Sequence, residues 1–406
     1  MDFFKEYGHI LGLIFMPVTY GFAGWLTNWV ALKMTFYPLE FRGLWDPYIG
    51  WQGIIPRKAH KMAGKAVDIV TERLLKVREI FAKLEADKIT ENLGEDLNQA
   101  VIDIVDYAGH RLYRDAWNVM PDLVKEQVSR TAGRQAPKIM QGVLKDVQED
   151  IDDIFDIKGL IIRNLTGPKA KLLVEMFQQV GAPEFKFIER SGFYFGFMLG
   201  LVQVAVWSLF PALWTLPIQG LIVGYATNWL ALTMIFRPLH RRKFGPIHYQ
   251  GLFLKRQNEV SEEYSRMIAQ RILTAENLVE ELFFGSAADR IFRSIDENVR
   301  KAIDEGVGVL GKPMVIMTAG EPVYDEVREF AVQVIKSRVP QVINKINPYV
   351  EEAMEIEKTM AERMKQLSPE EFEHVLRTAF KEDELILILV GAAIGGMIGL
   401  MQTLVM

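Results

Sequence analysis

Two Thr-Asn pairs lie inside apolar segments and are the polar groups in this sequence most suited to bind a ligand or another helix. They are Thr27-Asn28 and Thr227-Asn228. An amide in hydrocarbon is costly unless it is hydrogen-bonded, so these side chains must face a neighbouring helix or a wet cavity. Two interpretations stay open. The pairs either bond a partner helix contributed by the other half of the chain, or they form a binding site for a ligand or an ion.

A second set of polar side chains follows these apolar segments and could contact lipid phosphates. Lys and Arg gain about 1 kcal/mol each near anionic headgroups. Neighbouring aromatic residues such as Trp45 and Tyr249 suit the headgroup zone. The candidate contacts are Arg57, Lys58, Arg241, Arg242, Lys255 and Arg256. The alternative is ordinary topology signalling with no specific lipid.

Patterns that suggest catalysis or metal binding each lack an essential part. The stretch GVGVLGKP (306–313) resembles a phosphate-binding loop, but Pro313 replaces the required Ser or Thr and the preceding segment predicts a helix, not a strand. The acidic run 148–156 lacks the glycine and spacing of a calcium loop and predicts a solvated helix end. The six histidines form no metal-binding pair, and cysteine is absent. We therefore predict no enzymatic activity, cofactor or metal.

The apolar segments that carry the Thr-Asn pairs are long enough to cross a bilayer. Half of the residues are hydrophobic, and residues 191–236 contain no charged side chain. A helix needs about 20 apolar residues to cross the hydrocarbon core. The sequence predicts a membrane protein with four spans, at 15–36, 191–210, 215–236 and 385–406. The net charge of −5 gives no indication of nucleic-acid binding, and we expect no such partner.

The chain contains a duplication at an offset of about 200 residues. Residues 24–39 (GWLTNWVALKMTFYPL) and 224–239 (GYATNWLALTMIFRPL) are identical at ten of sixteen positions, and GFMLGLVQ (196–203) matches GGMIGLMQ (395–402). Each half has two spans, which predicts parallel repeats rather than inverted ones. The predicted segments are an N-terminal segment with the first span (1–36), a helical lobe (37–189), a hairpin of the second and third spans (190–236), a second helical lobe (237–383) and the fourth span (384–406).

The sequence pattern of both lobes predicts helices, so the predicted fold class is all-α. Residues 63–85 and 260–283 place apolar side chains at three- and four-residue spacing, which is typical of helices with one buried face. Ser368 is a predicted N-cap before Pro369. Basic residues flank the lobe side of the spans, and the positive-inside rule therefore predicts two cytoplasmic lobes.

Glycines at four-residue spacing mark the helix faces that pack closely. They are Gly196 and Gly200, Gly220 and Gly224, and Gly391, Gly395 and Gly399. Small residues on one stripe let helix backbones approach each other, within the chain or between chains.

The doubled T-N-W-x-A-L-x-M-x-F-x-P motif, the Q-G followed by a basic pair, and the terminal G-x-x-x-G-x-x-Q resemble one family. It is the domain-of-unknown-function 445 family of YheB-like and YjiN-like bacterial membrane proteins, and the resemblance covers essentially the whole chain. Lys33 and Tyr37 depart from Thr233 and Arg237 of the second copy. The resemblance implies a multi-pass location in the bacterial inner membrane and supplies no reaction or substrate.

The function we predict is a non-enzymatic scaffold or binding protein that presents helical lobes at the cytoplasmic membrane surface. Its expected partners are membrane lipids and, through the lobe helices, further copies of the chain or other proteins. The alternative is binding or translocation of a lipid or small solute at the interface of the two repeats.

Overall fold

The computed structural model describes residues 2–45, 48–244, 247–308, 311–377 and 384–404. Most of the described secondary structure is helical, which confirms the all-α prediction. The chain forms two compact units, and each unit takes segments from both halves of the sequence. Unit 1 comprises Met1–Ile69, Ile161–Met267 and Met360–Met406, and unit 2 comprises Val70–Leu160 and Ile268–Thr359.

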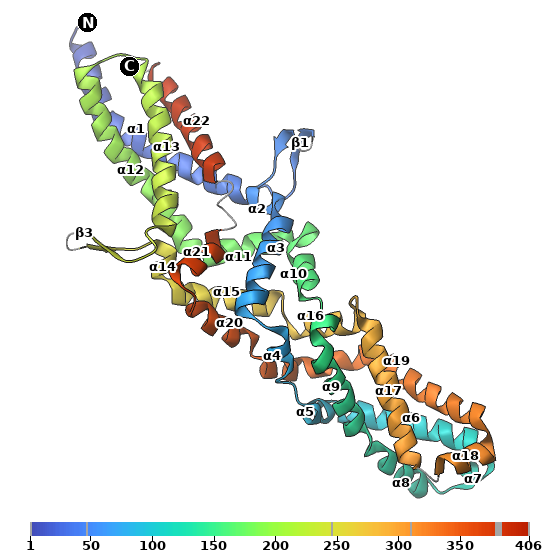
Figure 1. Cartoon of the computed structure of the whole chain (residues 1–406). Helices are drawn as coiled ribbons and strands as arrows, with labels where there is room; N and C mark the ends of the chain where they lie inside the picture. Colours follow the sequence, from blue (N-terminus) through green and yellow to red (C-terminus); the bar gives the residue numbers. More distant parts are fainter. Residues whose placement is uncertain (1, 46–47, 245–246, 309–310, 378–383, 405–406) are drawn as a thin grey trace. The chain divides into compact units, whose positions relative to one another are not determined.

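Four long helices of unit 1 lie side by side (Figure 1). They are α1 (Asp2–Phe36), α12 (Ala182–Leu209), α13 (Thr215–Phe236) and α22 (Glu384–Gln402). Helix α1 packs mainly along α12, and α13 packs mainly along α22. In the described part of the chain, α12, α13 and α22 are long and apolar enough to cross a membrane. The predicted span 15–36 lies within α1 and stays a prediction.

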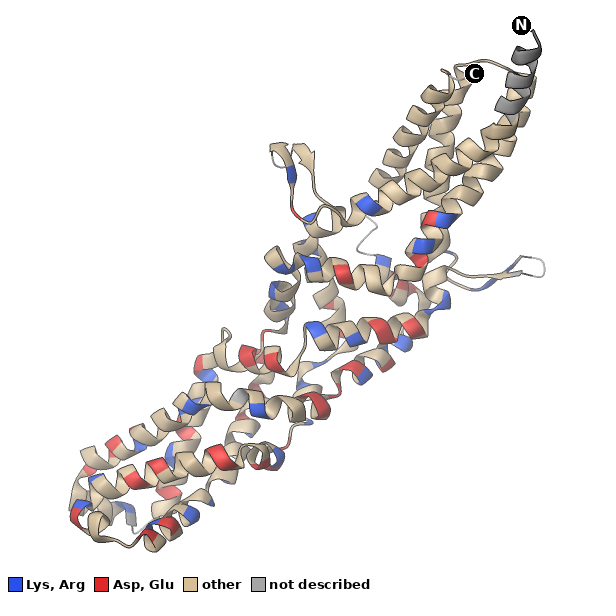
Figure 2. Ribbon diagram, turned by 180° about the vertical axis from the view of Figure 1, so that it is seen from behind, with Lys and Arg blue, Asp and Glu red and all other residues tan. Residues whose placement is uncertain are grey.

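The outward faces of these helices are apolar. Phe22, Met198, Leu221 and Ile386 are all exposed on the surface of the four-helix group. Charged residues are sparse there and frequent on the helices of unit 2, as Figure 2 shows. Large apolar side chains on an outer surface are favourable in hydrocarbon and unfavourable in water.

Small elements of the same kind follow α1 and α13. After α1 come β1 (Arg42–Trp45), β2 (Ile49–Trp51), α2 (Ile54–Arg57) and α3 (Ala59–Ile69). After α13 come β3 (Arg242–Phe244), β4 (Ile247–Tyr249), α14 (Leu252–Lys255) and α15 (Gln257–Arg271). Each pair of strands is an antiparallel hairpin.

Both hairpins are closed by matching backbone bonds. The Gly53 N–H donates to Pro38 O at 2.9 Å, and the Gly251 N–H donates to Pro238 O at 3.0 Å. The helical prediction missed these strands because each has only three or four residues, too few to establish a period of two. Asp46-Pro47 and Gly245-Pro246 are turn dipeptides in the sequence, and they were the available signal.

The remaining elements of unit 1 are short helices. They are η2 (Gly167–Lys169), α11 (Ala170–Val180) and α21 (Pro369–Arg377), with α10 (Ile157–Leu165) and α20 (Ile356–Lys365) crossing the boundary between the units, as α15 does. The predicted cap of α21 is confirmed. The Glu371 N–H donates to Ser368 Oγ at 3.2 Å, and the Ser368 N–H donates to Glu371 Oε2 at 3.0 Å, which together form a capping box.

Unit 2 is a helical body built from both halves of the sequence. Its elements from the first half are η1 (Val70–Leu74), α4 (Val77–Phe81), α5 (Ala86–Asn92), α6 (Gly94–Leu112), α7 (Arg114–Val119), α8 (Asp122–Gly133) and α9 (Ala136–Ile154). Those from the second half are α16 (Ala275–Phe284), α17 (Ala288–Val307), α18 (Gly311–Ala319) and α19 (Glu321–Met354). Helix α6 packs on α19, and α9 packs on α17.

Both predicted helices are interrupted in the structure, since 63–85 divides into α3, η1 and α4, and 260–283 divides into α15 and α16. The stretch 63–85 is interrupted after the π-helical turn η1, where Leu74 and Leu75 are both buried. The GVGVLGKP stretch begins in the last two residues of α17 and ends in the first three residues of α18, and Gly308 ends α17 with a φ of 79°. Residues 309–310 lie outside the described part.

Candidate functional site: two buried asparagines

The two asparagines occupy equivalent positions in the two helix pairs of unit 1. Asn28 on α1 donates Nδ2 to Ile188 O on α12 at 2.6 Å, and Asn228 on α13 donates Nδ2 to Leu387 O on α22 at 2.8 Å. Asn28 is 0% exposed and Asn228 is 3% exposed. Each amide therefore links two long helices through a backbone carbonyl that lies inside the other helix.

Glycines make room for these bonds. A Cβ built on Gly24 would lie 2.2 Å from Gly192 O, and one built on Gly224 would lie 2.1 Å from Gly391 O. At these distances an added methyl group cannot fit without moving the backbones apart. We call these two contacts, Gly24 with Gly192 and Gly224 with Gly391, the glycine seams. The close packing that the glycine stripes predict is confirmed within the chain, because Gly224 and Gly391 form the second seam and a Cβ on Gly196 would lie 2.2 Å from Tyr20 O.

The partners of the Thr-Asn pairs differ from the expected ones. Each asparagine bonds the second long helix of its own half, whereas we expected a helix of the other half. The hydroxyls of Thr27 and Thr227 bond carbonyls of their own helices, Gly24 O at 3.0 Å and Val223 O at 2.9 Å. A threonine hydroxyl reaches the carbonyl three or four residues back, so it is satisfied locally. The asparagine side chains are longer than those of threonine, and they reach the neighbouring helix, which the glycines allow to approach closely.

One oxygen atom at each asparagine is left without a hydrogen-bond donor among the described residues. Asn28 Oδ1 and Asn228 Oδ1 are both buried and unpaired. An amide oxygen accepts hydrogen bonds and does not titrate, so these atoms can hold a donor or a cation and cannot act as acid, base or nucleophile. In the described part of the chain, no group of three or more His, Asp or Glu side chains could hold a metal ion.

Two ion pairs hold the first turns of α12 and α22, and the sequence reasoning did not identify them. Arg256 donates Nη1 to both carboxylate oxygens of Glu184, at 2.9 and 3.0 Å, and the Glu184 side chain is 1% exposed. Arg377 binds Glu384 through two nitrogens, at 2.7 and 2.8 Å. Hydrogen bonds to Glu384 and Glu373 raise the pKa of Arg377 above its ordinary value. The glutamate that recurs at equivalent positions of the two repeats, Glu184 and Glu384, is the sequence feature that could have identified these pairs.

The structure divides the predicted headgroup contacts into residues that are exposed and residues that are partly buried. Arg57, Arg241, Arg242 and Lys255 are exposed. Arg256 instead holds Glu184, and Lys58 is only partly exposed. Apolar side chains of the first hairpin are exposed as well, since Leu44 is 93% exposed and Trp45 is 65% exposed. Lipid contact by the exposed basic residues stays a prediction.

Long apolar helices with an apolar outer surface define a helical membrane protein. Residues 218–345 match the model of the family described as "Protein of unknown function (DUF445)". Residues 218–345 are therefore similar to that family, which is the one that the doubled motif predicts.

Curated relatives agree with this assignment. A UPF0754 membrane protein of Anoxybacillus flavithermus is 34% identical over 101 residues, which are 23% of this chain and 26% of the relative. One of Shouchella clausii is 40% identical over 76 residues, 18% of this chain and 20% of the relative. One of Staphylococcus saprophyticus is 28% identical over 158 residues, 35% of this chain and 41% of the relative. The matched segments thus span less than half of each relative's length. No solved structure matches the chain significantly.

Proposed function

We propose that this protein is a non-catalytic scaffold whose four long helices anchor a helical binding unit at the cytoplasmic surface of the bacterial inner membrane. The observation that carries the proposal is the construction of unit 2, where both halves of the chain form one compact body. Tyr107 on α6 stacks on Phe330 of α19 with ring centroids 3.7 Å apart. Asp146 on α9 accepts from Ser294 on α17 at 2.6 Å. Such a body offers a fixed surface to a partner.

The anchor in this proposal has four spans arranged as two parallel repeats. Helix α1 is the fourth span because it packs along α12 as α13 packs along α22, with an asparagine bond in each pair. An even number of spans in each half keeps both lobes on one side. The basic flanks put that side in the cytoplasm.

A partner surface is suggested by apolar side chains at one end of unit 2. Helices α7, α8 and α18 lie at the same end of this unit (Figure 1). Val119 is 82% exposed, Leu123 is 80% exposed and Met317 is 87% exposed. Exposed apolar groups that gather in one region are typical of surfaces that bind other proteins. We propose that this end binds a partner or a second copy of the chain.

Photocrosslinking in native membranes tests this function. A photoreactive amino acid at Leu123 or Met317 should give an adduct of one defined mass, twice that of the monomer if a second copy binds. The matched control is the same amino acid at Lys145 on α9, whose side chain is 73% exposed in the same unit. Monomers alone at all three positions, in protein shown to be folded, would count against the scaffold.

A second candidate function is the binding or translocation of a lipid or small solute at the interface of the repeats. The unpaired Oδ1 atoms of Asn28 and Asn228 favour it, because a buried acceptor has a place for a donor. The glycine seams oppose it, since they leave no room between the backbones. Lipid or solute bound at these amides in a structure determined in nanodiscs supports this candidate, and a dry seam removes it.

A further inference from the structure

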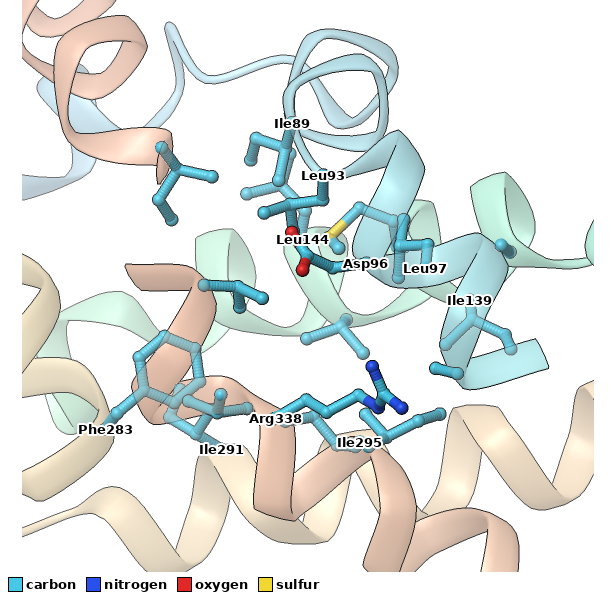
Figure 3. Close-up of a pocket in the computed structure, with 18 of the residues that line it drawn as sticks. Ile89, Leu93, Asp96, Leu97, Ile139, Leu144, Phe283, Ile291, Ile295 and Arg338 are labelled. Carbon is cyan, nitrogen blue, oxygen red and sulfur yellow. The ribbon is translucent and has the colours of Figure 1, made fainter. Parts of the chain in front are cut away.

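Unit 2 contains an apolar cavity of about 260 Å³ that is separate from the asparagines. Its walls come from α5, α6 and α9 of the first half and from α16, α17 and α19 of the second half. Figure 3 shows Leu93, which directly precedes α6, and Leu97 of α6, with Ile291 and Ile295 of α17 across the cavity. An apolar cavity of about 150 Å³ already binds benzene, so this one has room for a larger hydrocarbon.

The residues that line the cavity extend along two of its helices. Its lining on α9 extends from Ala136 to Val147, which is about 16 Å at 1.5 Å per residue. On α19 the lining extends from Ile335 to Met354, about 28 Å. The hydrocarbon core of a bilayer is about 30 Å thick, so one leaflet is about 15 Å deep. The extent of the lining therefore favours an extended alkyl chain over a compact ring.

A cation lies toward one end of this lining. Arg338 lines the cavity near the start of the α19 stretch, and its side chain is 25% exposed. Its described hydrogen bond gives Nη2 to Asp103, which leaves Nε and Nη1 for another acceptor. Asp96, the acidic residue in the lining, is already paired with Lys345 at 2.6 Å. The rim of the cavity can thus accept an anionic head beside Arg338.

We propose that this cavity binds one alkyl chain of an anionic amphiphile, with the chain along α9 and α19 and the head at Arg338. The inference goes beyond the scaffold function and does not depend on a protein partner. Burial of the chain is favoured by the apolar walls, and the guanidinium gives the charged head a fork of donors. A free fatty acid and an anionic phospholipid both supply this chemistry.

Photolabelling of the full chain in nanodiscs tests the proposal and separates the two sources. One arm uses a diazirine-bearing fatty acid, and the other uses a phosphatidylglycerol with a diazirine in one chain. Labelled peptides from α6, α9 or α19 in either arm support the cavity, and the arm that gives them identifies the source. Labels confined to α1, α12, α13 and α22 in both arms would overturn the proposal.

Variants that fill the cavity sharpen the test. Ala100→Phe and Ala132→Phe each add a ring to the lining, and each should lower labelling of unit 2 about tenfold. The matched control is Ala116→Phe on α7, an exposed position outside the lining, which should leave labelling unchanged. Circular dichroism and gel filtration establish that each variant is folded. Unchanged labelling in both folded filling variants contradicts the proposal.

The role of Arg338 has its own readout. Arg338→Gln should lower labelling by the fatty acid several-fold and leave labelling by a diazirine-bearing fatty alcohol unchanged, because only the acid carries a charge that pairs with the guanidinium. An equal effect on acid and alcohol would overturn the placement of the head.

Discussion

The helix pairs α1–α12 and α13–α22 have the same seam and different anchors. In both pairs an asparagine amide bonds a carbonyl of the facing helix beside a glycine contact. At their lobe ends the pairs differ, because Glu184 is held by Arg256 from the other half whereas Glu384 is held by Arg377 from its own half. The seam therefore joins helices within each half, and the Glu184 pair joins one half to the other.

The largest effect is expected at the glycine seams. Gly24→Ala and Gly224→Ala should each lower the free energy of unfolding by about 3 kcal/mol, because the new Cβ meets a backbone oxygen that cannot move alone. Titration with a denaturing detergent measures this. The control is Gly64→Ala on α3, which has open space and should gain about 0.5–1 kcal/mol. Unequal losses at the two seams would end their equivalence.

The next effect separates the two anchors. Glu184→Gln should cost about 2 kcal/mol, below the usual range for a broken buried pair because Arg256 is partly exposed and also binds Glu259. Glu384→Gln should cost about half as much, since Glu384 is more exposed and Arg377 keeps Glu373.

A double-mutant cycle checks the specificity of the anchors. Glu184 and Arg256 should couple, whereas Glu384 and Arg256 should act additively. Coupling of the second combination would contradict the separate anchors.

A smaller and equal effect is expected from the amides. Asn28→Leu and Asn228→Leu should each cost about 1 kcal/mol, because interhelical hydrogen bonds in membranes contribute about this much. Thermal unfolding in micelles provides the comparison. Thr27→Val and Thr227→Val are matched controls and should cost less, as their hydroxyls bond their own helices. A loss at only one asparagine would show that the halves use their amides differently.

The smallest expected effect is a pH dependence of stability that is present in unit 2 and absent from the glycine seams. The hydrogen bond from Arg300 lowers the pKa of Asp296 in the folded protein. This stabilisation is present above the unfolded pKa of about 3.9 and is lost as the pH falls through the lower folded value. Unit 2 should therefore lose less than about 1 kcal/mol per such partly exposed pair on acidification, while the amide bonds of Asn28 and Asn228 do not respond. Hydrogen exchange of α17 and α13 between pH 5 and pH 3 measures the difference, and Asp296→Asn should reduce it.

Much of the group of four long helices could be predicted from the sequence, and most of unit 2 could not. The cost of a buried amide predicted that Asn28 faces another helix, but its partner depends on which glycine lies opposite, and that is a tertiary property. The contact of Tyr107 with Phe330 joins residues more than 200 positions apart, and no local periodicity encodes it. The segment boundaries predicted from the membrane crossings stay a prediction. They divide the chain into consecutive segments, whereas each compact unit combines segments from both halves.

The interleaving of α6 with α19 also constrains the order of assembly. When the ribosome has completed only the first half, the surface of α6 that packs on α19 has no cover, because α19 has not yet been made. A protein shortened after residue 236 would keep a glycine seam and expose this face to water, which favours aggregation and degradation. Nonsense mutations in the second half should therefore leave little product rather than a working half-molecule.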